Sequence, residues 1–228
     1  YELSEIMERE NKDMIVNMLY VRSSLERANE SRREMEAVNV KLLKQSETDQ
    51  MTGLANRYRL NDYSDKVLDY CYEHRLPLAM EILDIDFFKQ YNDNYGHQQG
   101  DECIIAIADE LKKMEDRQTF CARYGGDEFI IIYAGASAEE VYAKAAALRQ
   151  NIMDLKLEHL YSKALPIVTI SQGISYGVPE EGNRSWDFLH TADMLLYQVK
   201  KKSRNDICIA DIRGQELELC SKQDKVEP

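Results

Sequence analysis

The chain has 228 residues, with 29 Lys and Arg against 41 Asp and Glu, and therefore a formal net charge of −12. So acidic a chain has no general attraction for nucleic-acid phosphates or anionic lipid, which argues against binding to either through bulk charge. No apolar run approaches the roughly 20 residues of a membrane span, and we expect no signal peptide. Because the sequence begins with Tyr1, we expect it to be part of a longer protein.

Residues 1 to 47 contain no Gly or Pro and are rich in good helix formers. Such a helix would extend roughly 65 to 70 Å, and alone it cannot bury its apolar stripe. We expect a parallel two-stranded coiled coil; a helix folded back on its own domain, or paired with upstream segments, remains the alternative. Steps of four and three residues select a heptad seam with three polar members. The seam consists of Met7, Asn11, Met14, Met18, Val21, Leu25, Ala28, Arg32, Met35, Asn39 and Leu42.

Residues 48 to 212 alternate between helical and strand patterns. In chain order they predict a turn at 49–56, helix 57–74, strand 77–86, a helical turn at 87–93, a helix from Gly96 to about 115, strands 119–124 and 128–134, helix 137–157, strand 167–176, helix 185–202 and strand 206–210. This order predicts an α+β domain whose central, mainly antiparallel sheet is flanked by helices. A polar tail over 213–228 follows.

Five scattered cysteines form no C-x-x-C pair, and the four histidines show no zinc-ligand spacing. An odd, scattered set of cysteines is typical of reduced thiols in a cytosolic protein. We therefore expect a cytoplasmic chain, and the sequence leaves open whether the full-length protein is tethered to a membrane.

Acidic residues gather at two predicted strand ends. Asp84 and Asp86 close the first strand on one face, because side chains repeat every second residue, and Asp127 and Glu128 follow a Gly-Gly hairpin. If these strands are neighbours, Asp84 and Asp127 reach one cation, and carboxylates are the ligands that Mg²⁺ prefers. The alternatives are a solvated strand end and an ordinary tight turn.

Basic residues end the last predicted helix, at Lys200, Lys201, Lys202 and Arg204. Taken alone, they complement the dipole of a helix C-terminus. Beside acids and a divalent ion, they become a candidate triphosphate clamp.

The segment Arg123–Phe129 (RYGGDEF) resembles the signature of the GGDEF family of diguanylate cyclases. The resemblance extends in order and spacing over residues 47 to 210. The other matching segments are Asp49–Arg57 (DQMTGLANR), Asp84–Asp101 (with DIDFFK, ND and GHQQGD), Val168–Gly173 (VTISQG) and the closing helix with Ala192, Asp193, Tyr197, Lys200, Arg204 and Asn205.

The resemblance implies a fold like adenylyl cyclases and polymerase palm domains, with a ferredoxin-like core. It implies an enzyme that condenses two GTP into cyclic di-GMP and releases two pyrophosphates, with two Mg²⁺ or Mn²⁺ ions per site. Residue by residue, it assigns the metals to Asp84, the Ile85 carbonyl, Asp127 and Glu128, guanine to Asn92 and Asp101, and the phosphates to the Phe87 and Phe88 amides, Lys200 and Arg204. Glu128, catalytic together with Asp127, would assist as second-metal ligand or as acceptor for the 3′-hydroxyl proton, and Gly125 and Gly126 would leave room for the nucleotide.

Each such domain holds one GTP, so the reaction implies a homodimer, and a coiled coil would raise the effective concentration of the second half-site. The chain would be the output domain below an upstream sensory region. Where family members often carry an Arg-x-x-Asp product-inhibition motif, this chain has Asp116 and Thr119, so we expect no such site. The competing interpretations are a GTP-binding regulatory module without turnover and a dimerisation stalk with a passive cap.

Overall fold

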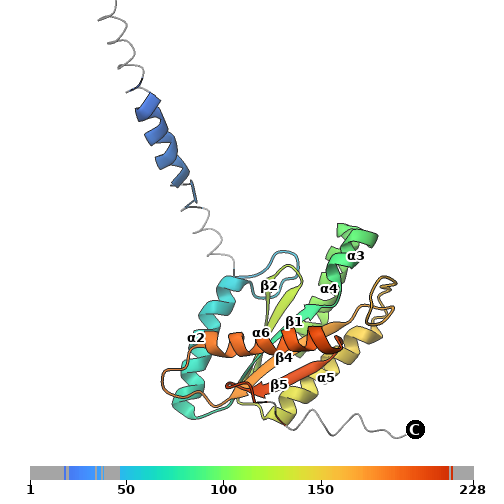
Figure 1. Cartoon of the computed structure of the whole chain (residues 1–228). Helices are drawn as coiled ribbons and strands as arrows, with labels where there is room; N and C mark the ends of the chain where they lie inside the picture. Colours follow the sequence, from blue (N-terminus) through green and yellow to red (C-terminus); the bar gives the residue numbers. More distant parts are fainter. Residues whose placement is uncertain are drawn as a thin grey trace, which may run out of the picture. The chain divides into compact units, whose positions relative to one another are not determined.

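A computed structural model describes residues 18, 21–33, 35–36, 38, 47–215 and 217. The chain divides into two compact units, residues 1–46 and residues 47–228 (Figure 1). The heptad positions at residues 7, 11, 14, 39 and 42 lie outside the described residues, as does most of the tail expected over 213–228.

The second unit contains five strands and five helices among its described residues. They are α2 (Arg57–His74), β1 (Leu78–Ile85), α3 (Phe88–Tyr95), α4 (His97–Met114), β2 (Thr119–Gly125), β3 (Glu128–Ala134), α5 (Ala138–Asp154), β4 (Ile170–Gly177), α6 (Ser185–Lys202) and β5 (Ile207–Asp211). The predicted order is confirmed. Most boundaries agree within two residues, and two differ by three: α5 ends at Asp154, because Lys156 adopts a left-handed conformation, and β4 begins at Ile170, while Ile167 forms only an isolated bridge.

Local signals in the sequence explain where the helices begin and end. Asn56 caps α2 by accepting a hydrogen bond from the Arg59 amide at 3.0 Å. Ser137 and Glu140 form a capping box at the start of α5. Such caps satisfy backbone N–H groups that have no partner inside the helix.

The sheet has the strand order β2-β3-β1-β4-β5. The pairs β2–β3, β3–β1 and β1–β4 are antiparallel, and β4–β5 is parallel. The predicted mainly antiparallel sheet is therefore confirmed, and β1 lies at its centre, where the acidic end of the strand has neighbours on both sides.

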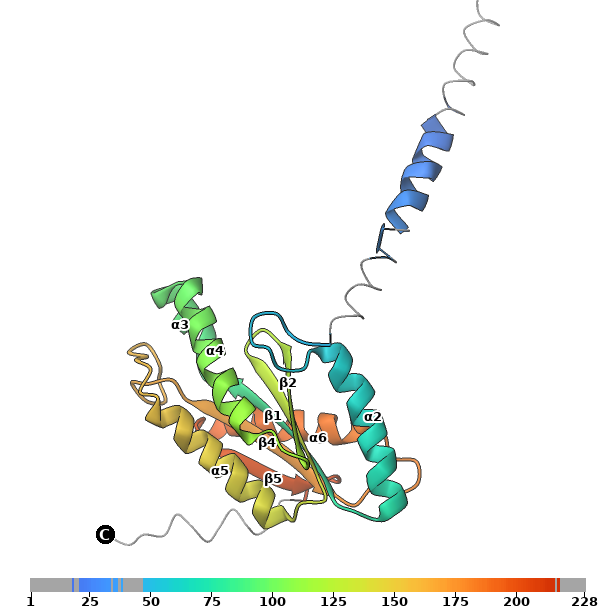
Figure 2. The ribbon, with the colours of Figure 1, turned by 180° about the vertical axis from the view of Figure 1, so that it is seen from behind.

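Helices cover both faces of the sheet. Alternate β1 residues Leu78, Met80 and Ile82 pack with α2 and α6, whereas Ala79, Leu83 and Ile85 pack with α4 and α5. Helix α6 crosses the sheet in the foreground of Figure 1, and α4 and α5 do so in Figure 2. The close approach of α6 requires Gly173, where a Cβ would lie 2.2 Å from the Ala192 carbonyl oxygen.

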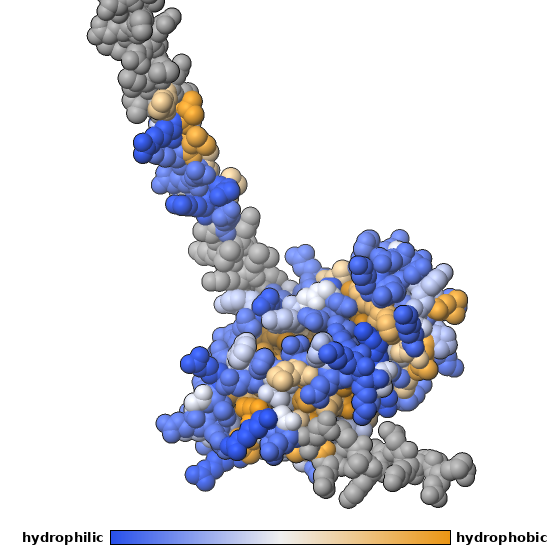
Figure 3. All heavy atoms as spheres, viewed as in Figure 1, coloured by the Kyte–Doolittle hydropathy of each residue, from blue (hydrophilic) through white to orange (hydrophobic). Residues whose placement is uncertain are grey.

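The described part of residues 18–38 is helical. Its seam residues Met18, Val21, Leu25 and Met35 are between 55% and 66% exposed. Apolar side chains follow one side of this segment and polar ones the other (Figure 3), so the helix has an apolar stripe that no other described residue of its own unit covers.

The four described cysteines, Cys71, Cys103, Cys121 and Cys208, are free thiols and buried. None of the described helices is long and apolar enough to cross a membrane.

Candidate active site

Two of the predicted metal ligands face each other across neighbouring strands. Asp84 in β1 pairs in register with Glu128 in β3. Each lies two residues along its strand from a residue that packs against α6, Ile82 in β1 and Ile130 in β3. Because side chains alternate between the two faces, both acids emerge on the α6 face of the sheet. Asp127 precedes Glu128 in the hairpin turn, where Gly126 adopts φ 56°, a conformation that glycine tolerates without a steric cost.

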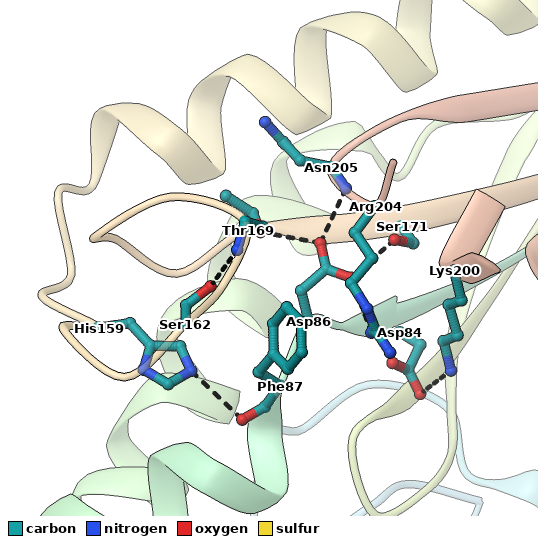
Figure 4. Close-up of polar contacts among 11 residues, drawn as sticks. Asp84, Asp86, Phe87, His159, Ser162, Thr169, Ser171, Lys200, Arg204 and Asn205 are labelled. Carbon is teal, nitrogen blue, oxygen red and sulfur yellow. Dashed lines mark hydrogen bonds and ion pairs between the residues drawn. The ribbon is translucent and has the colours of Figure 1, made fainter. Parts of the chain in front are cut away.

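The electrostatics of these acids are those of an unbalanced negative cluster. Burial raises the pKa of Asp84 to about 6; Lys200 lowers it in part, and the charges of Asp127 and Glu128 raise it again. The pKa of Glu128 is raised by burial and by Asp127 and Asp193, against Lys200. The Lys200 Nζ atom lies 2.7 Å from Asp84 Oδ2 (Figure 4). The ammonium group of Lys200 therefore partly balances the negative charge of this cluster.

Asp86 has a different environment from Asp84. It is fully buried and accepts hydrogen bonds from the Thr169 and Ser171 hydroxyls at 2.8 and 2.7 Å and from the Asn205 amide at 2.9 Å. Arg204 approaches it at 3.3 Å (Figure 4). Because its acceptor sites are taken, Asp86 joins β1 and β4 to the end of α6 and fixes the backbone on either side of it.

The backbone turns sharply at Phe87, between β1 and α3. Phe87 has φ 56° and precedes α3 without any side-chain cap. The Arg204 guanidinium lies 4.2 Å from the centre of its ring. The first amides of α3 therefore have no capping side chain, and a helix N-terminus of this kind favours an anion.

The two predicted guanine-binding residues lie on the paired helices α3 and α4. Asn92 Oδ1 is buried without a hydrogen-bond partner among the described residues. A Cβ at Gly100 would lie 1.8 Å from that oxygen, so the Asn92 side chain rests against the backbone immediately before Asp101. Asp101 itself is exposed. An unpaired buried amide oxygen beside an exposed carboxylate is suited to a ligand with several N–H groups.

Sequence reasoning missed the role of Arg123. Its guanidinium donates to Asp49 Oδ1 at 3.1 Å and to the Gly126 carbonyl at 3.1 and 2.8 Å. Asp49 also accepts from the Thr52 amide and hydroxyl. Arg123 therefore joins the turn at residues 49–56 to the hairpin that carries Asp127. Both segments stood out as motifs, but the sequence separation of 74 positions hid the pairing of Asp49 with Arg123.

The described residues contain no group of three His, Cys, Asp or Glu side chains that could hold a metal ion by themselves. This is compatible with Mg²⁺, which usually takes one or two protein carboxylates and completes its shell with water and substrate phosphates. The mutually repelling pair of buried Asp84 and half-buried Glu128 fits such an ion.

Asp116 and Thr119 stand where family members often carry the product-inhibition motif, and both contact a residue of α5. Lys144 of α5 lies 3.0 Å from Asp116 Oδ2 and donates to the Thr119 hydroxyl at 2.7 Å.

The fold matches solved structures of GGDEF domains. The coiled coil and GGDEF domain of DgcB from Caulobacter crescentus, in complex with c-di-GMP, aligns with a TM-score of 0.67 and 27% identity over 83% of this chain and 99% of that one. The active GGEEF domain of a diguanylate cyclase from Vibrio cholerae aligns with a TM-score of 0.59 and 30% identity over 68% and 97%.

Residues 46–206 match the family described as diguanylate cyclase, GGDEF domain. The chain belongs to this family. It is 34% identical over 163 residues to the probable diguanylate cyclase DgcC of Escherichia coli K12, covering 70% of this chain and 42% of that protein. It is 32% identical over 190 residues to diguanylate cyclase DgcP of Pseudomonas aeruginosa, covering 82% and 28%. The chain thus spans less than half the length of these relatives.

Proposed function

We propose that this chain is an active diguanylate cyclase that joins two GTP into cyclic di-GMP and releases two pyrophosphates. The observation that carries the proposal is the pairing of Asp84 with Glu128 on adjacent strands, next to Asp127. Relatives that are named diguanylate cyclases support it.

The metal ligands would be Asp84, the Ile85 carbonyl, Asp127 and Glu128, with two Mg²⁺ or Mn²⁺ ions per site. When bound, such ions activate the attacking 3′-oxygen and stabilise the leaving pyrophosphate. Glu128, whose pKa is raised by burial, would accept the 3′-hydroxyl proton.

The nucleotide would lie between the acid cluster and the pair α3 and α4. Asn92 and Asp101 would bind the guanine edge, Asp101 by accepting from the ring N–H and the exocyclic amine. The Phe87 and Phe88 amides, with Lys200 and Arg204, would hold the β- and γ-phosphates. Lys200 pairs with Asp84 at 2.7 Å, and in this proposal it turns to the phosphates when GTP binds. Gly125 and Gly126 would leave the nucleotide room; a Cβ at either meets no atom within 4 Å.

The assembly would be a homodimer, because each domain supplies one GTP. In this proposal residues 1–47 form a coiled-coil stalk, 48–212 the catalytic domain and 213–228 a tail, below an upstream sensory region in the cytoplasm. The exposed apolar stripe of the described helix supports the stalk, as does the coiled coil present in the DgcB structure.

Product inhibition through the Arg-x-x-Asp position would be absent. The Lys144 contacts to Asp116 and Thr119 support this, because they satisfy the polar groups at that position within the chain. Titrating cyclic di-GMP into the reaction should therefore inhibit it only weakly.

The test is incubation of the purified chain with GTP and Mg²⁺, followed by chromatography for cyclic di-GMP. Asp127→Ala and Glu128→Ala should each abolish synthesis and leave the unfolding midpoint unchanged. Asp109→Ala is the matched control, because this exposed α4 acid pairs, among the described residues, only with Lys112 on its own helix. Turnover retained by both active-site variants would contradict the site. Bound GTP without product in the wild type would favour a regulatory module.

A further inference from the structure

Phe87 has a backbone conformation that its own chemistry disfavours. Its φ of 56° and ψ of 30° are left-handed, where the Cβ of an L-residue crowds the backbone. Such a residue persists only when its surroundings fix it. Two contacts fix these surroundings. Asp86, the residue before Phe87, is held by hydrogen bonds such as that from Thr169, and the Arg204 guanidinium lies over the Phe87 ring.

A third contact reaches the Phe87 carbonyl from a distant loop. His159 Nε2 lies 3.2 Å from this oxygen (Figure 4), which also accepts the first helical bond of α3 from the Tyr91 amide at 3.0 Å. A carbonyl only accepts, so Nε2 carries the hydrogen. Burial lowers the pKa of His159, and the ring in this tautomer leaves Nδ1 as a buried acceptor with no partner among the described residues.

His159 is held firmly by the loop between α5 and β4. Its side chain is fully buried, whereas Leu160 and Tyr161 beside it are 64% and 55% exposed. The His159 amide donates to the Pro166 carbonyl at 3.0 Å. The ring meets Tyr91 edge to face, with centroids 5.1 Å apart, and the Leu160 amide donates to the Tyr95 hydroxyl at 3.0 Å.

We propose that His159 is a positioning residue for the triphosphate: its Nε2–H group holds the Phe87 carbonyl, and so keeps the backbone at 87 and 88 turned with its amides toward the phosphates. The imidazole does not touch substrate. The inference rests on the proposed function, because Phe87 matters to the reaction only if this turn binds GTP. Burying the Nδ1 atom of His159, unpaired among the residues that the structure describes, in an aromatic cluster costs free energy. A positioning role for the Nε2–H group gives a reason for a histidine at this place.

The test compares two substitutions of similar bulk. His159→Phe keeps an aromatic ring and removes the donor, while His159→Gln places an amide N–H near the position of Nε2. Loss of one hydrogen bond predicts a half-saturating GTP concentration about 3- to 10-fold higher for His159→Phe, with the maximal rate within about twofold of the wild type. Pyrophosphate should inhibit this variant more weakly by a similar factor. His159→Gln should restore both values to within about twofold of the wild type.

The control is Tyr161→Ala, which removes an exposed ring from the same loop that packs on Tyr95 and keeps the His159 side chain; it should leave the half-saturating GTP concentration unchanged. If His159→Phe does not fold, His159→Asn takes its place, because its shorter amide does not reach Phe87. The proposal would be overturned if His159→Phe left the half-saturating GTP concentration unchanged. It would also be overturned if His159→Phe and His159→Gln raised this concentration equally. A wild type without turnover would instead overturn the proposed function, and calorimetric GTP binding by the same variants would then test His159 independently.

Discussion

Glu81 is a carboxylate at the centre of the sheet that the candidate site does not use. It is fully buried on the face covered by α4 and α5, and it accepts hydrogen bonds from the Tyr133 hydroxyl at 2.8 Å and from Gln172 Nε2 at 2.6 Å. Burial raises its pKa from 4.5 to about 7 despite these bonds. The folded state therefore binds more protons than the unfolded state between these two pH values, and stability falls as pH rises through them.

Glu81→Gln should consequently stabilise the protein at alkaline pH. The ionised carboxylate costs on the order of 3 kcal/mol above pH 7, and an amide avoids this cost. The new N–H can donate to Gln172 Oε1, which has no partner among the described residues. We expect urea unfolding at pH 8 to show a gain of about 1 to 3 kcal/mol that shrinks at pH 5. An equal gain at both pH values would show that ionisation of Glu81 is not the cause.

Gly100→Ala should impair guanine binding without unfolding the domain. The new Cβ would collide with Asn92 Oδ1 at 1.8 Å, and the Asn92 side chain must leave its position. Loss of a buried polar contact to the base predicts a half-saturating GTP concentration raised about tenfold or more, measured in the cyclase assay.

Gly177→Ala is the matched control for this substitution. Its Cβ would meet no atom closer than 3.9 Å, so kinetics should be unchanged. Wild-type kinetics in Gly100→Ala would show that GTP binding does not require the Asn92 side chain in its present position.

At the level of elements, the Arg123 contacts connect the turn at 49–56 to the β2–β3 hairpin. One guanidinium reaches both Asp49 and the Gly126 carbonyl, which a planar fork of donors can do and an ammonium group cannot. The turn is also joined to β2 by the Arg123 amide, which donates to the Ala55 carbonyl at 2.9 Å, so the Arg123 side chain is one of the links between the turn and the hairpin.

Arg123→Lys should therefore lower turnover by about 10- to 100-fold, because charge-assisted hydrogen bonds of this kind are worth roughly 1.5 to 3 kcal/mol. The initial rate of cyclic di-GMP formation measures this. Arg59→Lys is the control from the same region, since the half-exposed Arg59 side chain has only long contacts, at 3.8 Å to Glu47 and 5.8 Å to the centre of the Phe120 ring, among the described residues. Equal rates in the wild type and Arg123→Lys would exclude a role for this link.

At the level of the whole molecule, activity should depend on how often two domains meet. The seam residues of the described helix are exposed in one chain, and a two-stranded coil would bury them. Deleting residues 1–45 should lower specific activity in dilute protein, and the difference should vanish as concentration approaches the millimolar range expected for tethered domains.

A point substitution tests the same idea without truncation. Leu25→Lys falls on the predicted seam and should act like the deletion, whereas Ser24→Lys falls beside it and should not. Sedimentation velocity of both variants gives the oligomeric state directly. Unchanged activity in the deletion at every concentration would contradict a dimerising stalk.

Much of this protein is determined by its sequence because the signals are local. The alternation of helical and strand patterns located the elements of the domain, and the RYGGDEF hairpin with its companion motifs indicated the family. Each signal depends on residues close together in the chain. The negative charge that argued against binding to polyanions is partly concentrated at Asp84, Asp127 and Glu128, a placement the motifs had already suggested.

Only the tertiary structure decided which distant groups meet. Asp84 and Asp86 look alike in sequence, yet strand pairing leaves one beside Lys200 and surrounds the other with donors from β4 and the segment after α6. Arg123 and Asp49, and likewise His159 and Phe87, come together only through the packing of the sheet against its loops. The physical reason is that hydrogen bonding and burial depend on distance in space, which the sequence separation of these pairs does not reveal.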